Sequence, residues 1–301
     1  MIQITDEFKK KIVAALMEAR AQYSGFDTTF ANKYGINEAV FSTLKSGKTD
    51  KLLSNGKWLT IARLLDVKMN DKKWHLAETD VFVTIKEDVL FCKQHSKARI
   101  YVDECGIGKT FTAKYLCRSL INCFYVDASQ CKTKQAFIRE IARTIGVDHN
   151  DRYVEVKANI KYWLTMVPEP IIIVDEAGDL EYNAFLELKE LWNATENVCG
   201  WYLMGADGLR KQIEKGIRNK KVGYREIFSR FSESYSSTVP QGREERIAFH
   251  KNLIEQVLIV NMEDTSQLND IVIKCLGNTK DLKKETIGGL RRAESLLLLN
   301  D

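Results

Sequence analysis

The sequence predicts an α/β protein in which helices flank both faces of a parallel sheet, with an all-helical module before the sheet and a helical segment after it. Two observations carry this prediction. Short apolar runs of strand length alternate with segments whose apolar residues recur at helical spacing, a pattern typical of parallel strands joined by crossover helices. The loop after the first run and the carboxylates after the third have the residues of a functional site. The runs lie at residues 100–102, 123–127, 171–174 and 200–205.

A phosphate-binding loop is expected after the first run. The motif G-x-x-x-x-G-K-[ST] is intact over GIGKT, residues 106–110, and the first glycine position holds Asp103. Backbone N–H groups of such a loop, with the positive end of the following helix, bind phosphate oxygens. We expect Lys109 to reach the β- and γ-phosphates and the Thr110 hydroxyl to ligate Mg²⁺. The segment expected to bind the nucleotide consists of Glu104, Cys105, Gly106, Ile107, Gly108, Lys109, Thr110 and Phe111.

Asp103 is the departure from the motif. The first glycine lies at the strand exit, away from the tightest curvature around the phosphates, so an aspartate there is expected to weaken or retune the site without abolishing it. Its carboxylate would repel nucleotide if it turned inward. A chance GxGKT in an unrelated turn is the alternative, and the strand before the motif and the helix after it argue against that alternative.

The third run ends in two carboxylates. Residues 171–174 read as a strand buried on both faces, and Asp175 and Glu176 follow them. A charged pair at such a strand end is costly unless something there requires negative charge, as Mg²⁺ does. We expect Asp175 to hold the metal through water and Glu176 to polarise the water that attacks the γ-phosphate. Two solvated acids would explain this motif alone, but not both motifs in this order.

Composition places the chain among globular proteins and argues against several other classes. Hydrophobic residues make up 45% and charged residues 29%. No apolar run approaches the roughly 18 residues of a membrane span, and the first residues lack a signal-peptide pattern, so we expect a cytoplasmic protein without a membrane partner. The seven cysteines form no C-x-x-C pair, which argues against structural zinc and a disulfide framework.

Residues 1–66 form the expected N-terminal domain. A helix closed by Gly25, a short helix with a turn at Gly35, and a third helix capped by Asn37 give the helix-turn-helix layout. FANKYGINEAVFSTLKSGK resembles the repressor-like helix-turn-helix, whose second helix enters the major groove. That resemblance implies DNA contacts by Asn37, Glu38, Ser42 and Lys45, with phosphate contacts by Lys48 and Lys51. A four-helix protein-docking module with the same periodicity remains an alternative.

The distribution of charge along the chain agrees with a nucleic-acid partner, although the excess of positive charge is modest. Residues 1–78 hold 13 Lys and Arg against nine Asp and Glu, whereas the rest of the chain sums to zero. A small basic module on a neutral body is typical of nucleic-acid binding. A polar linker is expected at 67–80, in which His75 is expected to be solvated, followed by an α/β core at 81–240 and a helical lid at 241–301.

The ordered motifs resemble those of AAA+ ATPases, which are P-loop NTPases. They are GIGKT, IIIVDE, a strand ending at Gly205-Ala206-Asp207, FSRF, and GGLRR before a helix. The resemblance covers about residues 80–300 and implies an AAA+ fold with a C-terminal helical lid, and ATP and Mg²⁺ as cofactors. An N-terminal helix-turn-helix joined to one such module resembles the bacteriophage Mu transposition protein B family, the ATP-dependent target-DNA activators of transposition.

The AAA+ resemblance implies further site residues. In that family an arginine from a neighbouring subunit contacts the γ-phosphate, and another in the lid senses nucleotide. By motif position Arg230 is the candidate finger, Arg225 the second candidate and Arg291 the lid sensor, although exposed arginines also form ordinary ion pairs. Asp207 is the nearest polar candidate at the end of the fourth strand, where Gly205 and Ala206 replace the usual polar residue, so slow hydrolysis is expected.

The resemblance also implies partners. An ATP site completed by a neighbouring subunit implies a homo-oligomer, and a DNA-binding member of this kind would form a ring or helical filament on double-stranded DNA. Its affinity would depend on phosphate contacts and fall with salt. The filament would mark target DNA and recruit a transposase. Two alternatives remain: a helicase loader or replication-initiation ATPase, and a nucleotide-binding regulator that scarcely hydrolyses ATP.

Overall fold

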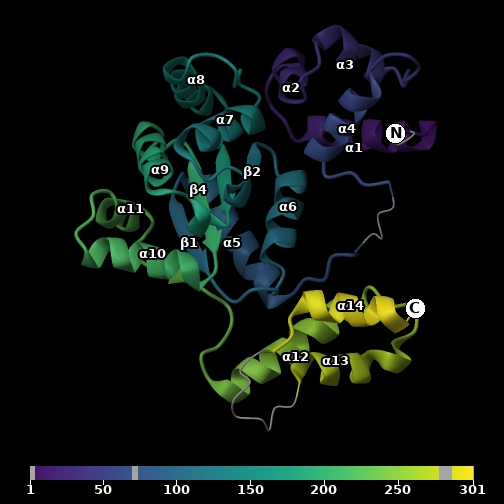
Figure 1. Ribbon diagram of the computed structural model, residues 1–301, viewed down its shortest axis with the longest axis vertical. Helices are drawn as coiled ribbons and strands as arrows, with labels where there is room; N and C mark the ends of the chain where they lie inside the picture. Colours follow the sequence, from purple (N-terminus) through teal and green to yellow (C-terminus); the bar gives the residue numbers. More distant parts are fainter. Residues whose placement is uncertain (1–3, 70–73, 278–286, 301) are drawn as a thin grey trace.

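The computed structural model describes residues 4–69, 74–277 and 287–300. It is elongated, with a helical module at the N-terminal end, an α/β core in the middle and a helical lid at the opposite end (Figure 1). The N-terminal helices are α1 (Asp6–Ala21), α2 (Asp27–Lys33), α3 (Glu38–Lys45) and α4 (Asn55–Leu64). The lid helices are α12 (Arg243–Ile259), α13 (Leu268–Leu276) and α14 (Leu290–Asn300).

The core contains the sheet and the helices that cover it. Its strands are β1 (Ala98–Val102), β2 (Cys123–Asp127), β3 (Ile171–Asp175), β4 (Gly200–Gly205) and β5 (Tyr235–Ser236). Its helices are α5 (Asp80–His95), α6 (Lys109–Ser119), α7 (Lys134–Ile145), α8 (Tyr153–Met166), α9 (Tyr182–Ala194), α10 (Asp207–Arg218) and α11 (Tyr224–Arg230). Strands β1 to β4 coincide with the four apolar runs of the sequence.

The five strands form one sheet in the order β2-β3-β4-β1-β5, and every pair is parallel. The register sets Val102 beside Gly205 and Asp127 beside Asp175. The carboxyl ends of β1, β3 and β4 therefore meet at one edge, where ligands of parallel sheets bind. The predicted α/β class, a parallel sheet flanked by helices, is confirmed. The two-residue strand β5 is too short to leave a periodic pattern in the sequence.

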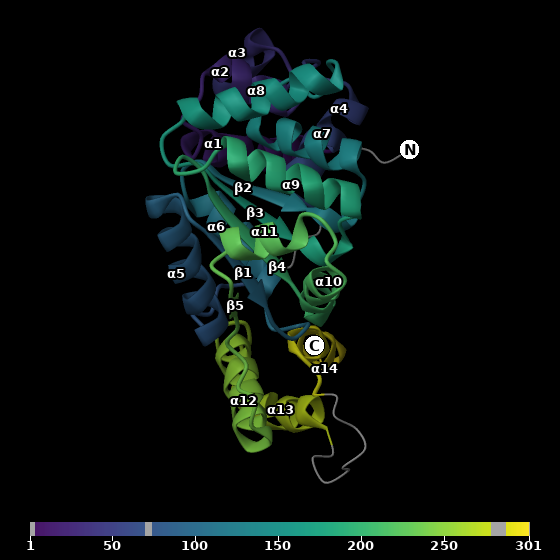
Figure 2. The ribbon, with the colours of Figure 1, turned by 90° about the vertical axis from the view of Figure 1, so that its left-hand side faces the viewer.

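Two helical layers cover the sheet. Helices α5 and α6 lie on one face, whereas α7, α9 and α10 lie on the other (Figure 2). All residues of the central strands β3 and β4 are buried as a result. Because both faces are covered, residues 171–174 of β3 are a continuous run of β-branched residues instead of an alternating pattern.

The N-terminal module packs directly on the core. The Tyr23 ring stacks on Trp163 of α8 with the ring centroids 5.9 Å apart, and its hydroxyl donates to the Ile145 carbonyl at 3.0 Å. The Ser24 hydroxyl donates to Oδ1 of the buried Asn122 at 2.8 Å, just before β2. Buried side chains of the module and of the core belong to one continuous hydrophobic cluster. The module is thus held against the side of the core remote from the lid (Figure 1).

Candidate nucleotide site

The loop between β1 and α6 has the backbone shape of a phosphate-binding loop. Gly106 and Gly108 have φ values of 77° and 100°, in the left-handed region that glycine tolerates best. Helix α6 begins at Lys109, so its free N–H groups and positive dipole end face the loop. The sequence adopts this shape because glycine occupies both left-handed positions that precede the helix.

Lys109 lies at the centre of this loop and is only 8% exposed. Its Nζ donates to the carbonyl oxygens of Asp103 at 2.9 Å and Glu104 at 2.5 Å. Burial lowers the pKa of Lys109, and the nearby negative groups only partly oppose that effect. Phosphate oxygens at the loop would favour the charged ammonium, which agrees with the role predicted for this side chain.

Asp175, at the end of β3, is 1% exposed and accepts hydrogen bonds from its surroundings. Its Oδ2 accepts from the Thr110 hydroxyl at 2.7 Å and from the Tyr125 hydroxyl at 3.0 Å. A hydroxyl and a carboxylate in contact form the oxygen donor set that suits Mg²⁺ held together with nucleotide phosphates. The structure thus brings together the two residues predicted to hold the metal, and adds Tyr125.

Glu176 follows at the carboxyl end of β3, with an exposed side chain that lines the pocket. Its φ of 50° is in the left-handed region, which is uncommon for a residue other than glycine. Partial burial and the neighbouring Asp175 carboxylate raise the pKa of Glu176. A carboxylate of raised pKa at a pocket wall is suited to accept a proton from water.

Asp103 does not turn toward the phosphate position. Its Oδ2 accepts hydrogen bonds from the Tyr101 hydroxyl at 3.0 Å and from the backbone N–H groups of Thr238 and Val239 at 2.6 and 3.0 Å. Its Oδ1 accepts from the N–H of Glu104 at 2.8 Å. The carboxylate therefore connects the phosphate loop to the segment that leads into the lid, and the repulsion expected from an inward-facing aspartate does not arise.

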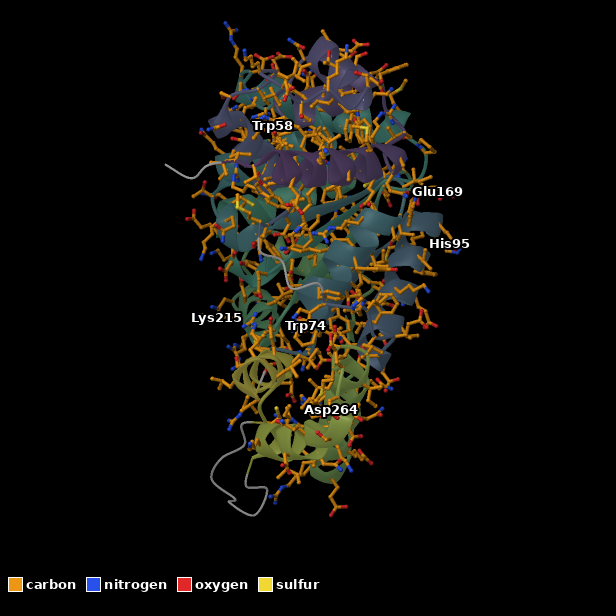
Figure 3. The ribbon with its side chains drawn as sticks, turned by 90° about the vertical axis from the view of Figure 1, so that its right-hand side faces the viewer. Trp58, Trp74, His95, Glu169, Lys215 and Asp264 are labelled. Atoms are coloured by element: carbon orange, nitrogen blue, oxygen red, sulfur yellow. The ribbon has the colours of Figure 1, made fainter. Side chains whose placement is uncertain are left out.

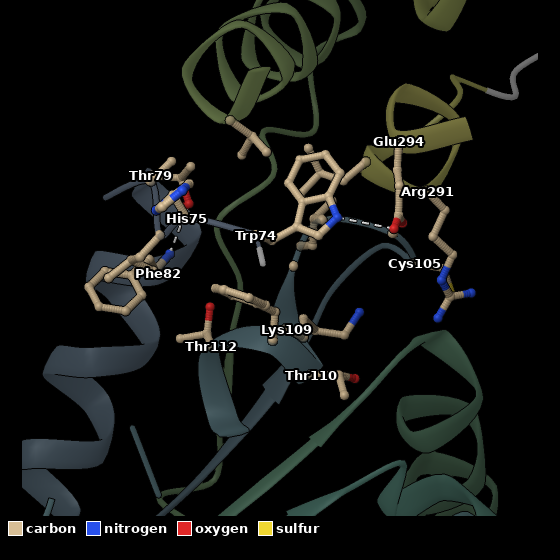
Figure 4. Close-up of a pocket in the computed structure, with 18 of the residues that line it drawn as sticks. Trp74, His75, Thr79, Phe82, Cys105, Lys109, Thr110, Thr112, Arg291 and Glu294 are labelled. Atoms are coloured by element: carbon tan, nitrogen blue, oxygen red, sulfur yellow. Dashed lines mark hydrogen bonds between the residues drawn. The ribbon is translucent and has the colours of Figure 1, made fainter. Parts of the chain in front are cut away.

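A cavity of about 290 Å³ lies over the loop, between the core and the lid (Figure 4). Its floor is the loop and the start of α6, and Glu176 lines it as well. The segment before α5, the first turn of α5 and the lid provide the other walls. These walls contain residues that sequence reasoning did not assign to the site: Trp74, His75, Leu76, Ala77, Thr79, Phe82, Val257, Leu290 and Glu294.

The predicted linker is part of the pocket wall and is attached to the lid. Trp74 Nε1 donates to Oε1 of Glu294 in α14 at 3.1 Å. The backbone of His75 makes two hydrogen bonds with the Asn261 side chain, at 2.6 Å through its N–H and at 3.1 Å through its carbonyl. The His75 side chain is exposed, yet it also lines the cavity. Part of the predicted linker, residues 70–73, lies outside the described residues.

The lid touches the phosphate loop itself. The N–H of Leu290 donates to the Gly106 carbonyl at 2.8 Å. A Cβ on Gly289 would lie only 2.6 Å from that same carbonyl oxygen, so the GG pair of the sequence permits this close approach. Arg291, the predicted lid sensor, follows at once and lines the cavity (Figure 4). The structure therefore brings Arg291 to the same pocket as Lys109 and Thr110.

Five residues predicted for the nucleotide site do not line this cavity: Glu104, Asp175, Asp207, Arg225 and Arg230. Glu104 and Asp175 nevertheless contact Lys109 and Thr110, which do line it. Asp207 is exposed as the first residue of α10 and does not line the pocket. Arg225 lies 3.5 Å from the Glu233 carboxylate, and the Arg230 guanidinium lies 5.3 Å from the Trp192 ring centroid. Both arginines belong to α11, and within one chain neither reaches the cavity.

The residues predicted to contact DNA are all exposed, on α3 and the loop after it. Three of them also make contacts within the module. Asn37 Oδ1 accepts from the Val40 N–H at 2.8 Å as the cap of α3, and Lys45 Nζ lies 2.9 Å from Asp27 Oδ2. Glu38 accepts a hydrogen bond from the Thr28 hydroxyl. The remaining three are Ser42, Lys48 and Lys51.

Comparison with known families gives a match to part of the chain. Residues 100–213 match the family model described as an AAA domain, and this segment contains the phosphate loop, Asp175 and Glu176. The match supports the assignment of this segment to the AAA+/P-loop ATPases and a nucleotide-binding ATPase function. No curated protein matches the chain. No helix within the described parts of the chain combines the length and apolarity that a membrane crossing requires.

Proposed function

We propose that this protein is an ATP-dependent DNA-binding ATPase that oligomerises on target duplex DNA and recruits a transposase. The observation that carries the proposal is the make-up of the pocket wall. The segment that follows the N-terminal module, the phosphate loop and the lid all line one cavity. A nucleotide in that cavity would contact all three parts, so its presence can influence how the module and the lid are held.

Each part of the site has a chemical task in this proposal. Lys109 binds the β- and γ-phosphates, and Thr110 and Asp175 would hold the Mg²⁺ that offsets phosphate charge during hydrolysis. Glu176 accepts the proton of the attacking water, a task that its raised pKa favours. Trp74 and Phe82 supply aromatic surface in a cavity whose floor binds phosphates, and a nucleotide base has a π-face that suits them.

Oligomerisation is proposed because of where the two candidate finger arginines lie. Arg225 and Arg230 are on α11, away from the cavity of their own chain. One of them would reach the γ-phosphate held by a neighbouring copy, where a guanidinium grips phosphate oxygens with two hydrogen bonds. Hydrolysis would then remove a contact between copies and loosen the assembly.

DNA binding is proposed for the exposed surface of α3. Figure 1 shows α3 on the outer side of the module, away from the core. Its candidate side chains are exposed, which a major-groove helix requires. A protein-docking role for the same surface is the competing hypothesis. The identity of the protein that binds the ATP-loaded chain would distinguish the two functions: a transposase supports the transposition hypothesis, and a replicative helicase supports the helicase-loader hypothesis.

Electron microscopy of the full chain with duplex DNA, with and without ATP, tests the proposal. The expected result is filaments or rings on DNA with ATP only, which Lys109→Ala loses because the phosphates lose their cation. A matched control, Lys274→Ala, removes an exposed lysine of α13 outside the cavity lining and should assemble normally. Assembly by Lys109→Ala equal to that of the unmodified protein would refute the nucleotide switch, and retention of a replicative helicase in place of a transposase would favour the loader.

A further inference from the structure

Residues 207–221, which comprise α10 and the turn after it, are unusually basic. They contain six Lys and Arg against two Asp and Glu, a net charge of +4. Residues 1–78 also carry a net charge of +4, so the remaining residues sum to −4 and this segment is a second basic region of a chain whose total is +4. Neither the nucleotide site nor the N-terminal module uses any of these six cations.

Four of the cations form a stripe, which we call the α10 stripe and define as Lys211, Lys215, Arg218 and Lys220. The first three are spaced i, i+4 and i+7, so they share one side of the helix. The opposite side of α10 buries Leu209, Ile213 and Gly216. All four are exposed, and Figure 3 shows Lys215 at the edge of the molecule, near the level at which core and lid meet.

The stripe residues have no partners among the described residues. No carboxylate in residues 4–69, 74–277 or 287–300 lies within ion-pair distance of any of the four. Glu214, on the same helix, is the one exposed carboxylate between them. The other two cations behave differently, because the Arg210 guanidinium lies 5.1 Å from the Tyr235 ring centroid and Lys221 Nζ lies 3.7 Å from that of Tyr182.

The stripe is held on a rigid support. A Cβ on Gly216 would lie 2.3 Å from the Tyr224 ring, so glycine lets α11 pack tightly against α10. Tyr224 in turn stacks on Phe185 of α9 with ring centroids 5.1 Å apart. Gln212 Nε2 donates to the Leu180 carbonyl at 3.1 Å. Charges fixed on a packed helix lose less conformational freedom on binding than charges on a loop.

The helix dipole explains only part of this arrangement. Cations in the last turn of a helix are stabilising, which accounts for Lys215 and Arg218. It does not account for Lys211 in the first half of α10, nor for Lys220 beyond its end. A row of exposed, unpaired cations points to a polyanionic partner.

We propose that the α10 stripe contacts the phosphate backbone of duplex DNA, independently of base sequence and separately from the N-terminal module. The inference rests on the proposed DNA-binding function and adds a second contact surface to it. From residue 211 to 218 the helix rises about 10 Å, which equals about three phosphate-to-phosphate steps of one strand at ~3.4 Å each along the DNA axis. Each phosphate contact releases counterions, so the stripe should raise the salt dependence of binding.

Salt-dependent binding of the full chain to a labelled random-sequence duplex, measured by fluorescence anisotropy with a non-hydrolysable ATP analogue, tests this proposal. The stripe variant is Lys211→Gln/Lys215→Gln/Arg218→Gln. The matched control, Lys10→Gln/Arg152→Gln/Lys274→Gln, removes three exposed cations from other surfaces. Circular dichroism should show both variants folded, because the replaced side chains are exposed.

The expected result is a weaker affinity and a shallower plot of log K against log salt for the stripe variant, by about 0.9 per lost contact and about 2.7 for three. The control should keep the slope of the unmodified protein. Equal slopes for the stripe variant and the control would refute the proposed contact between the α10 stripe and DNA, while DNA binding by the rest of the chain would remain supported. If the stripe variant lost self-association in the absence of DNA and kept the salt slope of the unmodified protein, the proposed DNA contact would be wrong and the α10 stripe would instead form a contact between copies of the chain. An unmodified protein that binds no DNA would refute the proposed function as well.

Discussion

The Glu104 carboxylate of the phosphate loop contacts Arg246 and His250 of α12 at the same time. Its Oε2 accepts from Arg246 Nη2 at 3.0 Å and lies 3.1 Å from His250 Nε2, and Arg246 Nε donates to Oε1. Burial raises the pKa of Glu104, but the hydrogen bonds and charges of Arg246 and His250 outweigh burial and hold it below its usual value. One carboxylate of the loop therefore attaches the first lid helix to the site.

Glu104→Gln should loosen the lid. The change removes the charge that Arg246 pairs with, and since both side chains are partly exposed the expected loss is about 1 kcal/mol after solvent screening. The folded-state pKa is lowered from 4.5, so this contribution is fully present above pH 4.5 and disappears only in stronger acid. Thermal unfolding at pH 7 and at pH 4 measures it, with Glu263→Gln in the lid as control. An equal effect of both variants at pH 7 would contradict the attachment.

Asp103→Gly, which restores the glycine of the phosphate motif, should harm the protein. The buried carboxylate accepts hydrogen bonds from three backbone N–H groups, those of Glu104, Thr238 and Val239. Leaving buried donors unpaired costs about 1–3 kcal/mol each, less where water can enter. We expect a lower melting temperature and no gain in ATP hydrolysis, measured by calorimetry and phosphate release. Asp103→Asn retains an acceptor oxygen and should lie between the two, and a stabilised, faster Asp103→Gly would disprove this account.

Tyr125 should act as a positioning residue for Asp175. Its hydroxyl and that of Thr110 both donate to the same carboxylate oxygen. In Tyr125→Phe the carboxylate loses one of these donors and is less well oriented, so the Mg²⁺ concentration for half-maximal hydrolysis should rise several-fold with little change in melting temperature. Tyr162→Phe on the exposed side of α8 is the control. A lower maximal rate at an unchanged Mg²⁺ requirement would argue against a role through Asp175.

Glu176→Gln should separate nucleotide binding from hydrolysis. Removing a general base costs about 10²- to 10⁴-fold in rate, while contacts to the phosphates remain. Because partial burial and Asp175 raise the pKa of Glu176 above 4.5, the rate of the unmodified protein should fall in acid as that carboxylate becomes protonated. The variant should not lose stability at pH 7, since the folded protein disfavours the charged form there. Phosphate release and equilibrium nucleotide binding measure the two effects, and unchanged release by the variant would rule out Glu176 as the base.

Trp74→Ala should weaken nucleotide binding without touching the phosphate loop. The change removes aromatic surface from the cavity and the hydrogen bond to Glu294. Loss of base stacking costs about 1–3 kcal/mol, or roughly 5- to 150-fold in affinity. Trp74→Phe keeps an aromatic ring but no N–H donor, so the two variants separate stacking from the contact with the lid. Equal affinity for ATP of the unmodified protein and both variants would show that Trp74 does not contact the nucleotide.

The parts of the site that the sequence predicted lie in short motifs, each of which is recognisable by itself, and Arg291 was added from the position of its motif in the resembling family. Lys109 and Thr110 lie in a motif whose spacing determines the loop, and Asp175 and Glu176 end an apolar run, so both could be recognised from local pattern. Strands β1 to β4 were predictable for the same reason, because apolar runs of this length have few alternatives. Helix α11 could not be predicted in this way, since its seven residues are too few to show helical periodicity.

The remaining parts of the site depend on contacts between distant segments. Nothing in the polar stretch around Trp74 shows that it contacts Glu294, which lies 220 residues further along the chain. The direction of the Asp103 carboxylate likewise depends on Val239, which arrives from the far end of the core. A tryptophan in an otherwise polar linker was the one available signal, because a large aromatic side chain is seldom left in water.

Asn122 has a consequence for dissecting the protein. This buried residue accepts from Ser24 through Oδ1, its backbone N–H donates to the Gln22 carbonyl, and its side-chain amide donates to the Pro168 carbonyl. A fragment cut ahead of α5 would leave Oδ1 and the backbone N–H of Asn122 without their N-terminal partners and would uncover the Trp163 ring to water. The core is therefore not expected to fold stably without the first 66 residues. The protein should be purified, assayed and crystallised as the full chain.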